Sequence, residues 1–139
     1  MTALRLGSGA PWEAAVGYSR VVATADAAWV SGTTATLDGV VVHPGDAAAQ
    51  TRVALTTVAQ ALADAGFALG DVVRTRMYVT DISQWEQVGR VHGEFFGDIR
   101  PATSMIQVAA LIDPAMLVEI EADAVRGSGD PGTTARGAA

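Results

Sequence analysis

The chain has 139 residues, half of them hydrophobic, with no cysteine and a formal net charge of −6. A chain of this size and composition can fold as one globular domain with its own core. The lack of cysteine excludes disulfides, thiol nucleophiles and thiolate metal ligands. All nine cationic side chains are arginines, so catalysis through a lysine Schiff base is excluded as well.

The charge and hydropathy patterns argue against nucleic-acid and membrane partners. A nucleic-acid interface needs a stripe of positive charge along the path of the phosphates, and no basic cluster interrupts the acidic balance here. No apolar run approaches the roughly 18 residues that cross a bilayer. No basic segment followed by an apolar one opens the sequence, so we expect no secretory signal and a cytoplasmic location.

The first part of the chain is predicted to form two β-hairpins. Apolar segments at residues 19–23 and 27–32 flank a turn sequence at residues 24–27. Asp38-Gly39 is a second turn signal, and a strand is expected to follow it at residues 40–43.

A helix is predicted over residues 46–65. Its apolar positions recur at steps of three and four residues, which is the period of an amphipathic helix. Asp46 suits the N-cap, and Gly66 suits the position after the last turn. Gln50 is expected on the polar face of this helix.

A second helix is predicted to begin at Ser83 and to end at Gly97. Ser83 and Glu86 have the spacing of a capping box, in which Glu86 bonds back to the Ser83 amide. Trp85 and Phe95 are expected on its inner face, because they fall at helical spacing.

Strands at residues 71–79, 103–109 and 116–125 complete the pattern. Strands, helix, strand, helix and strands, in that order, predict an α+β fold with both helices on one face of the sheet. We expect a single domain over residues 1–126. The glycine-rich tail at residues 127–139 has nothing to bury and is expected to be disordered.

Several short segments, in order and at matching spacing, resemble the RidA/YjgF/YER057c/UK114 family of small trimeric proteins. The matching segments are Tyr18-Ser19, Val30-Ser31-Gly32, Gln50-Thr51-Arg52, Val79-Thr80-Asp81, Glu94-Phe95-Phe96 and Val118-Glu119-Ile120-Glu121-Ala122. Each segment alone is a weak signal, but together they extend over nearly the whole chain.

The resemblance implies a six-stranded mixed sheet with two helices packed on one face, and a homotrimer with ligand clefts between its subunits. It also implies a deaminase that hydrolyses reactive imines or enamines without a cofactor or a metal. A small-molecule ligand is the expected partner besides the other subunits.

One position departs from the family pattern. Where the family has Pro-Ala-Arg-Ser, whose guanidinium holds the substrate carboxylate, this chain reads Pro101-Ala102-Thr103-Ser104. Loss of that charge-assisted hydrogen bond removes roughly 1.5–3 kcal/mol. The chain thus resembles a divergent subgroup without the arginine. Its cleft prefers a neutral ligand, binds an acid group elsewhere, or no longer catalyses a reaction.

Glu119 and Tyr18 are the predicted catalytic residues. Alternation along residues 117–124 places Glu119 on the face opposite to the apolar core residues. The resemblance implies that Glu119 orients or activates the attacking water, and burial of a carboxylate raises its pKa toward the working range. It also places Tyr18 in the cleft, where the hydroxyl can assist the leaving amine.

Arginines on a neighbouring strand leave alternatives open. Arg74 and Arg76 share a face with Tyr78 and can form a ladder of ion pairs with the acids at residues 119–123. Arg76 can instead replace the missing arginine, because its planar guanidinium binds a carboxylate through two hydrogen bonds.

The predicted substrate-binding residues are Trp12, Ser31, Gly32, Arg76, Phe95, Thr103 and Met105. A glycine permits close approach of a ligand to the backbone. Trp12 either caps the cleft or anchors its loop. The two histidines are far apart in the sequence and predict no metal site.

Three functions are consistent with the sequence. The first is a hydrolase or deaminase of an imine, an enamine or a related C–N metabolite. The second is a trimer that binds a small metabolite without turnover. The third is an endoribonuclease, against which the acidic charge argues.

Overall fold

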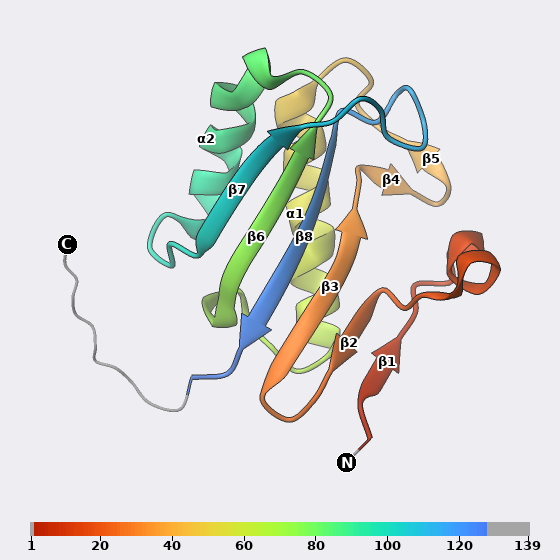
Figure 1. Ribbon diagram of the computed structural model, residues 1–139, viewed down its shortest axis with the longest axis vertical. Helices are drawn as coiled ribbons and strands as arrows, with labels where there is room; N and C mark the ends of the chain where they lie inside the picture. Colours follow the sequence, from red (N-terminus) through yellow and green to blue (C-terminus); the bar gives the residue numbers. More distant parts are fainter. Residues whose placement is uncertain (1, 128–139) are drawn as a thin grey trace.

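Six strands form one sheet, and two helices cover one of its faces (Figure 1). The computed structural model describes residues 2–127 of the chain. Across the sheet the strands are β1 (Leu4–Leu6), β2 (Val21–Ala23), β3 (Ala27–Thr33), β8 (Val118–Val125), β6 (Val72–Val79) and β7 (Ala102–Gln107). The β6–β7 pair is parallel and the other pairs are antiparallel, so the predicted six-stranded mixed sheet is confirmed.

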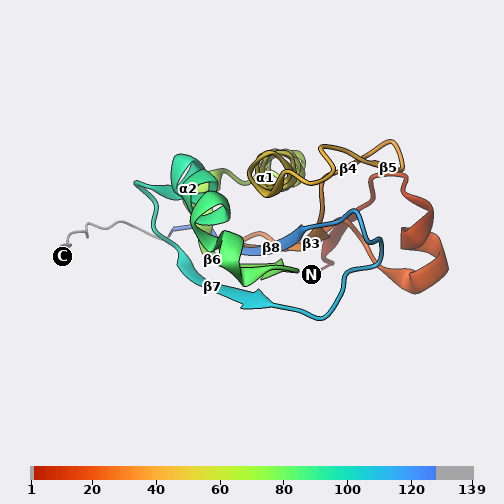
Figure 2. The same cartoon turned by 90° about the horizontal axis from the view of Figure 1, so that it is seen from above.

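The helices α1 (Ala47–Asp64) and α2 (Trp85–Phe96) lie together on the same side of the sheet (Figure 2). The core lies between this layer and the sheet, and its largest fully buried side chains include Phe96, Leu55 and Ile120. The predicted α+β arrangement is therefore confirmed. Within residues 2–127, no helix or further sheet covers the opposite face of the sheet (Figure 2).

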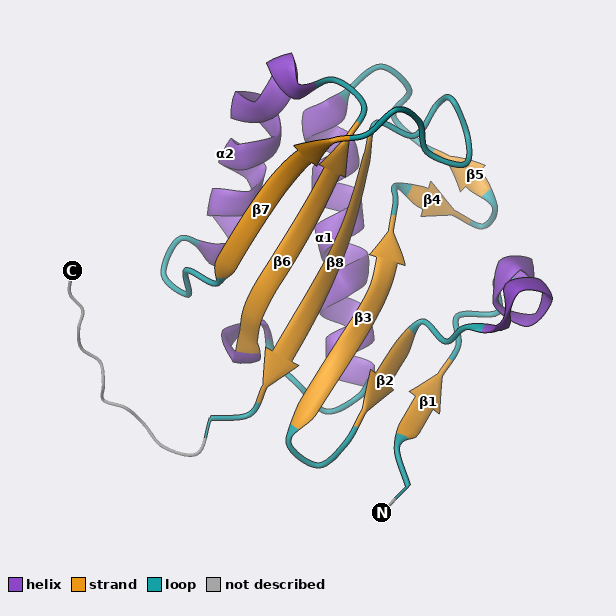
Figure 3. Cartoon of the chain, in the orientation of Figure 1, coloured by secondary structure: helices purple, strands orange, loops and turns teal. Residues whose placement is uncertain are grey.

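A small second sheet adjoins the main one. Its strands are β4 (Thr36–Leu37) and β5 (Val40–Val41), shown beyond the end of β3 in Figure 3. Asp38 and Gly39 join them with φ values of 51° and 79°. Two left-handed residues are what a two-residue hairpin turn requires, so the Asp38-Gly39 signal predicted this turn correctly.

Helix α1 begins and ends as predicted, but one of its side chains was misplaced. The Asp46 carboxylate accepts a hydrogen bond from the Ala49 amide at 3.0 Å, and Gly66 follows the last turn with φ of 86°. Gln50, expected on the polar face, is fully buried. Its amide satisfies backbone groups of neighbouring loops, which periodicity of hydrophobic residues cannot indicate.

Gln50 ties α1 to the segment that leads into β8. Its Nε2 donates to the carbonyl of Ala115 at 2.9 Å and lies within 3.3 Å of those of Val42 and His43. Its Oε1 accepts from the Leu117 amide at 2.8 Å. The side chain therefore fixes the start of the strand that carries Glu119.

Replacing Gln50 with leucine is expected to destabilise the fold by about 2–4 kcal/mol, because buried backbone donors and acceptors lose their partner. Equilibrium denaturation at one protein concentration measures this. The matched control is Gln60→Leu on the exposed side of α1, which should change stability by no more than about 0.5 kcal/mol. Equal stabilities of the two variants would contradict the assigned role of Gln50.

The predicted start of α2 was wrong. A 3₁₀ turn at Ile82–Gln84 precedes the helix, and Asp81 caps it by accepting from the Ser83 amide at 3.0 Å. Ser83 donates its hydroxyl to the same carboxylate, so it does not form the predicted capping box with Glu86. This shift leaves Trp85 56% exposed instead of on the inner face.

Two N-terminal elements were not predicted. Strand β1 is short, and the turn Glu13–Gly17 is a single π-helical turn without buried residues, so neither has a strong hydrophobic pattern. The predicted disordered tail lies outside the described residues, apart from Gly127. None of the helices within residues 2–127 has the length and apolar character required to cross a lipid bilayer.

Candidate functional site

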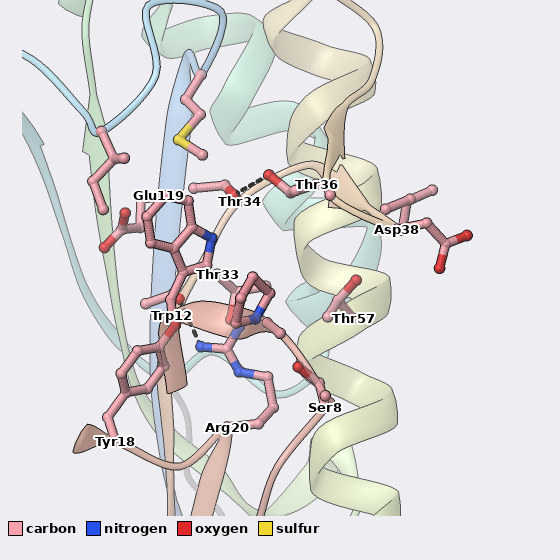
Figure 4. A pocket seen from close by; sticks show the side chains of 18 residues that line it. Ser8, Trp12, Tyr18, Arg20, Thr33, Thr34, Thr36, Asp38, Thr57 and Glu119 are labelled. Atoms are coloured by element: carbon pink, nitrogen blue, oxygen red, sulfur yellow. Dashed lines mark hydrogen bonds between the residues drawn. The ribbon is translucent and has the colours of Figure 1, made fainter. Parts of the chain in front are cut away.

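A cavity of about 650 Å³ lies beside the end of β3 (Figure 4). Its walls come from the loop before the π-helical turn, the segment that enters β2, strands β3 and β8, helix α1 and the small hairpin. Apolar side chains and threonine hydroxyls surround three charged side chains, which are Arg20, Asp38 and Glu119. Such mixed, concave walls suit a small molecule that carries both apolar and polar groups.

Glu119 reaches the cavity from β8 and lies directly against the backbone of Gly32 on β3. A Cβ atom added at Gly32 would be 2.1 Å from Glu119 Oε2 and 2.8 Å from its Cδ. The pairing of β3 with β8 is irregular between Val30 and Thr33, which is where the glycine occurs. The Glu119 carboxylate thus lies against the backbone at Gly32, where a ligand was expected to approach.

The environment of Glu119 increases its affinity for a proton. Burial raises the pKa of this carboxyl, the nearby charge of Glu121 raises it further, and the charge of Arg20 lowers it. Strand alternation places Glu119 opposite the buried Val118 and Ile120, as predicted. A carboxylate of this kind can accept a proton from a bound water, because its pKa lies nearer to neutrality than that of an exposed glutamate.

Arg20 is a charged residue of the cavity that was not predicted from the sequence. Its backbone extends the β2 edge, since its amide donates to the Leu6 carbonyl at 2.8 Å and its carbonyl accepts from the Ser31 amide. The guanidinium crosses toward β3 and its Nη2 donates to the Gly32 carbonyl at 2.7 Å. The spacing of Tyr18 and Arg20 could have indicated this residue, because side chains two residues apart in an extended segment share a face.

Arg20 and Glu119 point into one cavity from either side of β3 (Figure 4). Burial lowers the pKa of Arg20, while electrostatic interactions with Tyr18, Glu13 and Glu119 raise it. The guanidinium and the carboxylate therefore stabilise each other's charged forms without forming an ion pair among the described residues.

Tyr18 and Trp12, two of the predicted site residues, both line the cavity. Trp12 is 48% exposed, which favours a cap over a packed loop anchor. Their loop is held by Glu13, whose carboxylate accepts from the Ser8 hydroxyl and from the Ser8 amide at 3.0 Å, and this bonding lowers the pKa of Glu13. Gly17, with φ of 93°, turns the chain from the π-helical turn into Tyr18.

Ser31 supports the cavity from behind. Its hydroxyl donates to the Ser19 carbonyl at 2.6 Å, and its carbonyl accepts from the Thr33 hydroxyl at 2.7 Å. Ser19 lies between Tyr18 and Arg20, so the Ser31 hydroxyl positions the segment that carries both. Ser31 itself is absent from the cavity lining.

The remaining predicted ligand contacts lie elsewhere in the subunit. Thr103 and Met105 are on the edge strand β7, Phe95 is on α2, and none of them lines the cavity. The hydroxyls of Thr103 and Thr75 are 2.7 Å apart, and Thr75 in turn bonds His92 Nε2 at 2.8 Å.

The chain segment around Thr103 thus has its own polar network. Burial lowers the pKa of His92, the residue at its inner end. Thr103 also donates toward the Pro101 carbonyl at 3.3 Å. The Thr103 hydroxyl is therefore occupied by contacts within the subunit.

Arg76 forms the ion-pair ladder that was one of its two interpretations. Its Nη1 lies 3.2 Å from Glu121 Oε1 and 3.2 Å from Asp123 Oδ2, on the uncovered face of the sheet. Arg76 does not line the cavity. Its role as a carboxylate clamp stays a prediction.

Within residues 2–127, no three histidine, aspartate or glutamate side chains are grouped closely enough to hold a metal ion. His43 and His92 lie on separate elements. The ionisable side chains that line the cavity are two carboxylates, Asp38 and Glu119, one guanidinium, Arg20, and one phenol, Tyr18.

The family described as Endoribonuclease L-PSP matches residues 8–126 of the chain. The structure of Rv2704 from Mycobacterium tuberculosis, a member of the YjgF/YER057c/UK114 family, is 53% identical with a TM-score of 0.81, over 89% of this chain and 99% of Rv2704. The 3-aminoacrylate deaminase RutC from Acinetobacter baylyi is 41% identical over 58% of this chain and 63% of RutC. TdcF from E. coli, solved with bound serine, is 27% identical with a TM-score of 0.73, over 88% of this chain and 94% of TdcF.

Proposed function

Since the chain belongs to the RidA/YjgF/YER057c/UK114 (L-PSP) family, we propose that it is a cofactor-free hydrolase of a small imine or enamine, with Glu119 as the base that activates water. Members of this family include a deaminase, RutC, and a protein that binds serine, TdcF. The proposal includes one family domain over residues 1–126 and a cytoplasmic location.

The main support for the proposal is the position of the Glu119 carboxylate against the backbone of Gly32. A carboxylate with a raised pKa faces a cavity large enough for a small metabolite, and a glycine leaves room for it. A residue that served only in an ion pair would be expected to contact its partner, as Arg76 contacts Glu121 and Asp123. Glu119 forms no ion pair within residues 2–127.

The proposed reaction is the hydrolysis of a C=N bond. Glu119 accepts a proton from water while the oxygen adds to the imine carbon, and the C=N electron pair takes up a proton from solvent at nitrogen, which gives a carbinolamine. Glu119 then returns its proton to the nitrogen, the C–N bond breaks to release ammonia, and the hydroxyl proton is lost to solvent as the carbonyl forms. Tyr18, whose hydroxyl lines the same cavity, supports the leaving nitrogen. Water and imine thus give a carbonyl compound and ammonia.

A homotrimer is part of the proposal. The uncovered face of the sheet carries large exposed apolar side chains, among them Trp29 and Ile106, and a partner subunit is the usual cover for such a surface. We place the edge that carries Phe95, Thr103 and Met105 across the cleft from the cavity of an adjacent subunit. The chain would then be a divergent member of the family, with Thr103 where the arginine is lost.

The third candidate, RNA cleavage, is weakened by charge. The net charge is −6, and Arg76 on the uncovered sheet face is already paired with Glu121 and Asp123. Phosphates would find few of the free cationic contacts that RNA binding requires. Binding without turnover stays the main rival, because Thr103 has no charge with which to hold a substrate.

Ammonia release from freshly generated imines tests the proposal. The native assembly, with its mass determined by light scattering, is expected to be a trimer and to accelerate release over buffer. A ligand that raises the melting temperature without any acceleration would instead support the binding protein. A monomer in solution would overturn the intersubunit cleft.

A further inference from the structure

Arg20 is the one cationic side chain among the described residues that line the cavity. A guanidinium has five N–H donors. Within residues 2–127, Arg20 uses one of them in a hydrogen bond, from Nη2 to the Gly32 carbonyl, and its Nε is buried without a partner. The side chain therefore has donors that the subunit leaves unused.

Two other arginines have carboxylate partners, in contrast to Arg20. Arg52 bonds the carboxylate of Glu94 at 2.8 Å, and Arg76 contacts two carboxylates at 3.2 Å. Arg20 has no carboxylate within ion-pair distance among the described residues, although it is the more buried cation. A partly buried guanidinium with an unpartnered donor and no carboxylate in direct contact is costly, so an anionic group of a ligand would stabilise it.

We infer that Arg20 binds the carboxylate of the ligand, so that this chain selects imines of 2-oxo acids from the β2–β3 wall of the cleft instead of through the lost arginine. This inference rests on the proposed hydrolysis, whose substrate it specifies. It also answers the question raised by Thr103, since the cleft keeps an acid-binding group at a different position.

The position of Arg20 relative to Glu119 supports this assignment. Both side chains contact the same residue, Gly32, one through its carbonyl and the other against its α-carbon. In a 2-imino acid the carboxylate is bonded directly to the imine carbon. An acid held by Arg20 therefore places the reacting carbon beside the carboxylate that activates water. The apolar residues Trp12, Ile112 and Met116 remain for the side chain of the substrate.

Binding affinities measured by calorimetry test the assignment. The two probes are 4-methyl-2-oxopentanoate, a stable product of the proposed reaction, and its neutral amide, which differs in charge but little in shape. Wild-type protein is expected to bind the acid more tightly than the amide. Arg20→Gln should weaken acid binding by about 10- to 100-fold, as the loss of a charge-assisted hydrogen bond predicts, and change amide binding by no more than about twofold.

Two comparisons keep the test decisive. Arg52→Gln removes an exposed arginine of α1 and should keep the wild-type preference for the acid. Arg20→Lys retains the positive charge and should retain part of the preference. If Arg20→Gln does not fold, the wild-type protein alone suffices, because equal affinity for the acid and the amide would overturn the inference.

Turnover separates this inference from the proposed function. Acid-selective binding that depends on Arg20, without acceleration of ammonia release from the leucine-derived 2-imino acid, would support Arg20 and overturn the hydrolase. Equal hydrolysis of acid and amide imines by wild type and by Arg20→Gln would support the hydrolase and overturn the role of Arg20.

Discussion

Glu119→Gln is expected to lower kcat for imine hydrolysis by about 10²- to 10⁴-fold, which is the usual contribution of a positioned general base. Glutamine has the same shape, so it should keep the seat against Gly32 while losing the ability to accept a proton. Ligand affinity should change little. Single-turnover ammonia release and calorimetry on the same preparation measure the two quantities.

The matched control is Glu86→Gln, which removes an exposed carboxylate of α2. It should leave the rate of hydrolysis unchanged. Unaltered turnover in Glu119→Gln, with the fold intact, would remove the base from the mechanism and leave the binding protein as the better explanation.

The pH dependence of kcat/KM gives an independent signature of Glu119. A base must be ionised to act, so the rate should rise with pH through the pKa of Glu119, which burial raises above the ordinary value of 4.5. Arg20 lowers this pKa and Glu121 raises it. The rising limb should therefore move to higher pH in Arg20→Gln and to lower pH in Glu121→Gln. Shifts in the same direction would mean that another group titrates.

The sequence predicted the fold well where regular patterns determine it. Helix α1 and strand β8 have strong periodicity, and Asp46 and Gly66 mark the ends of the helix by well-understood capping chemistry. The errors occurred where polar side chains serve tertiary contacts. Gln50 bonds the segment at Ala115 and Leu117, which is distant in sequence, and Asp81 displaces Ser83 as the cap. Such contacts depend on the approach of separate segments, which local spacing does not reveal.

The site was predicted in part for the same reason. Alternation correctly placed Glu119 on the face away from the core, and Tyr18, Trp12 and Gly32 do line one cavity. Arg20 was missed, because its importance depends on burial and on the absence of a carboxylate partner. Neither property is visible in a sequence. We favour Arg20 over Arg76 as the candidate anion site, because Arg76 already contacts two carboxylates and Arg20 bonds only a carbonyl.

Gly32→Ala is expected to remove most of the activity while leaving the fold in place. The added methyl group would occupy the position of the Glu119 carboxylate, 2.1 Å from Oε2, so the flexible side chain must move away. The φ angle of Gly32 is not in the left-handed region, so the backbone accepts alanine without strain. A displacement of about 1 Å at a catalytic group can cost roughly 10²-fold in rate, and we expect a loss of that order.

Measurement of kcat and of thermal stability in the same variant distinguishes displacement from unfolding. Gly93→Ala on α2 is the control, because no atom lies within 4 Å of the added methyl group. It should keep full activity and gain up to about 1 kcal/mol of stability, since alanine suits a helix better than glycine.

The double variant Gly32→Ala/Glu119→Gln tests whether Gly32 and Glu119 contribute to activity through the same group, the Glu119 carboxylate. If Gly32→Ala acts by moving Glu119, adding it to Glu119→Gln should cost little further activity, because the base has already been lost. Additive losses would instead assign Gly32 a contact of its own with the ligand, which was the first expectation from the sequence. The cycle therefore decides whether this glycine serves the substrate or the carboxylate beside it.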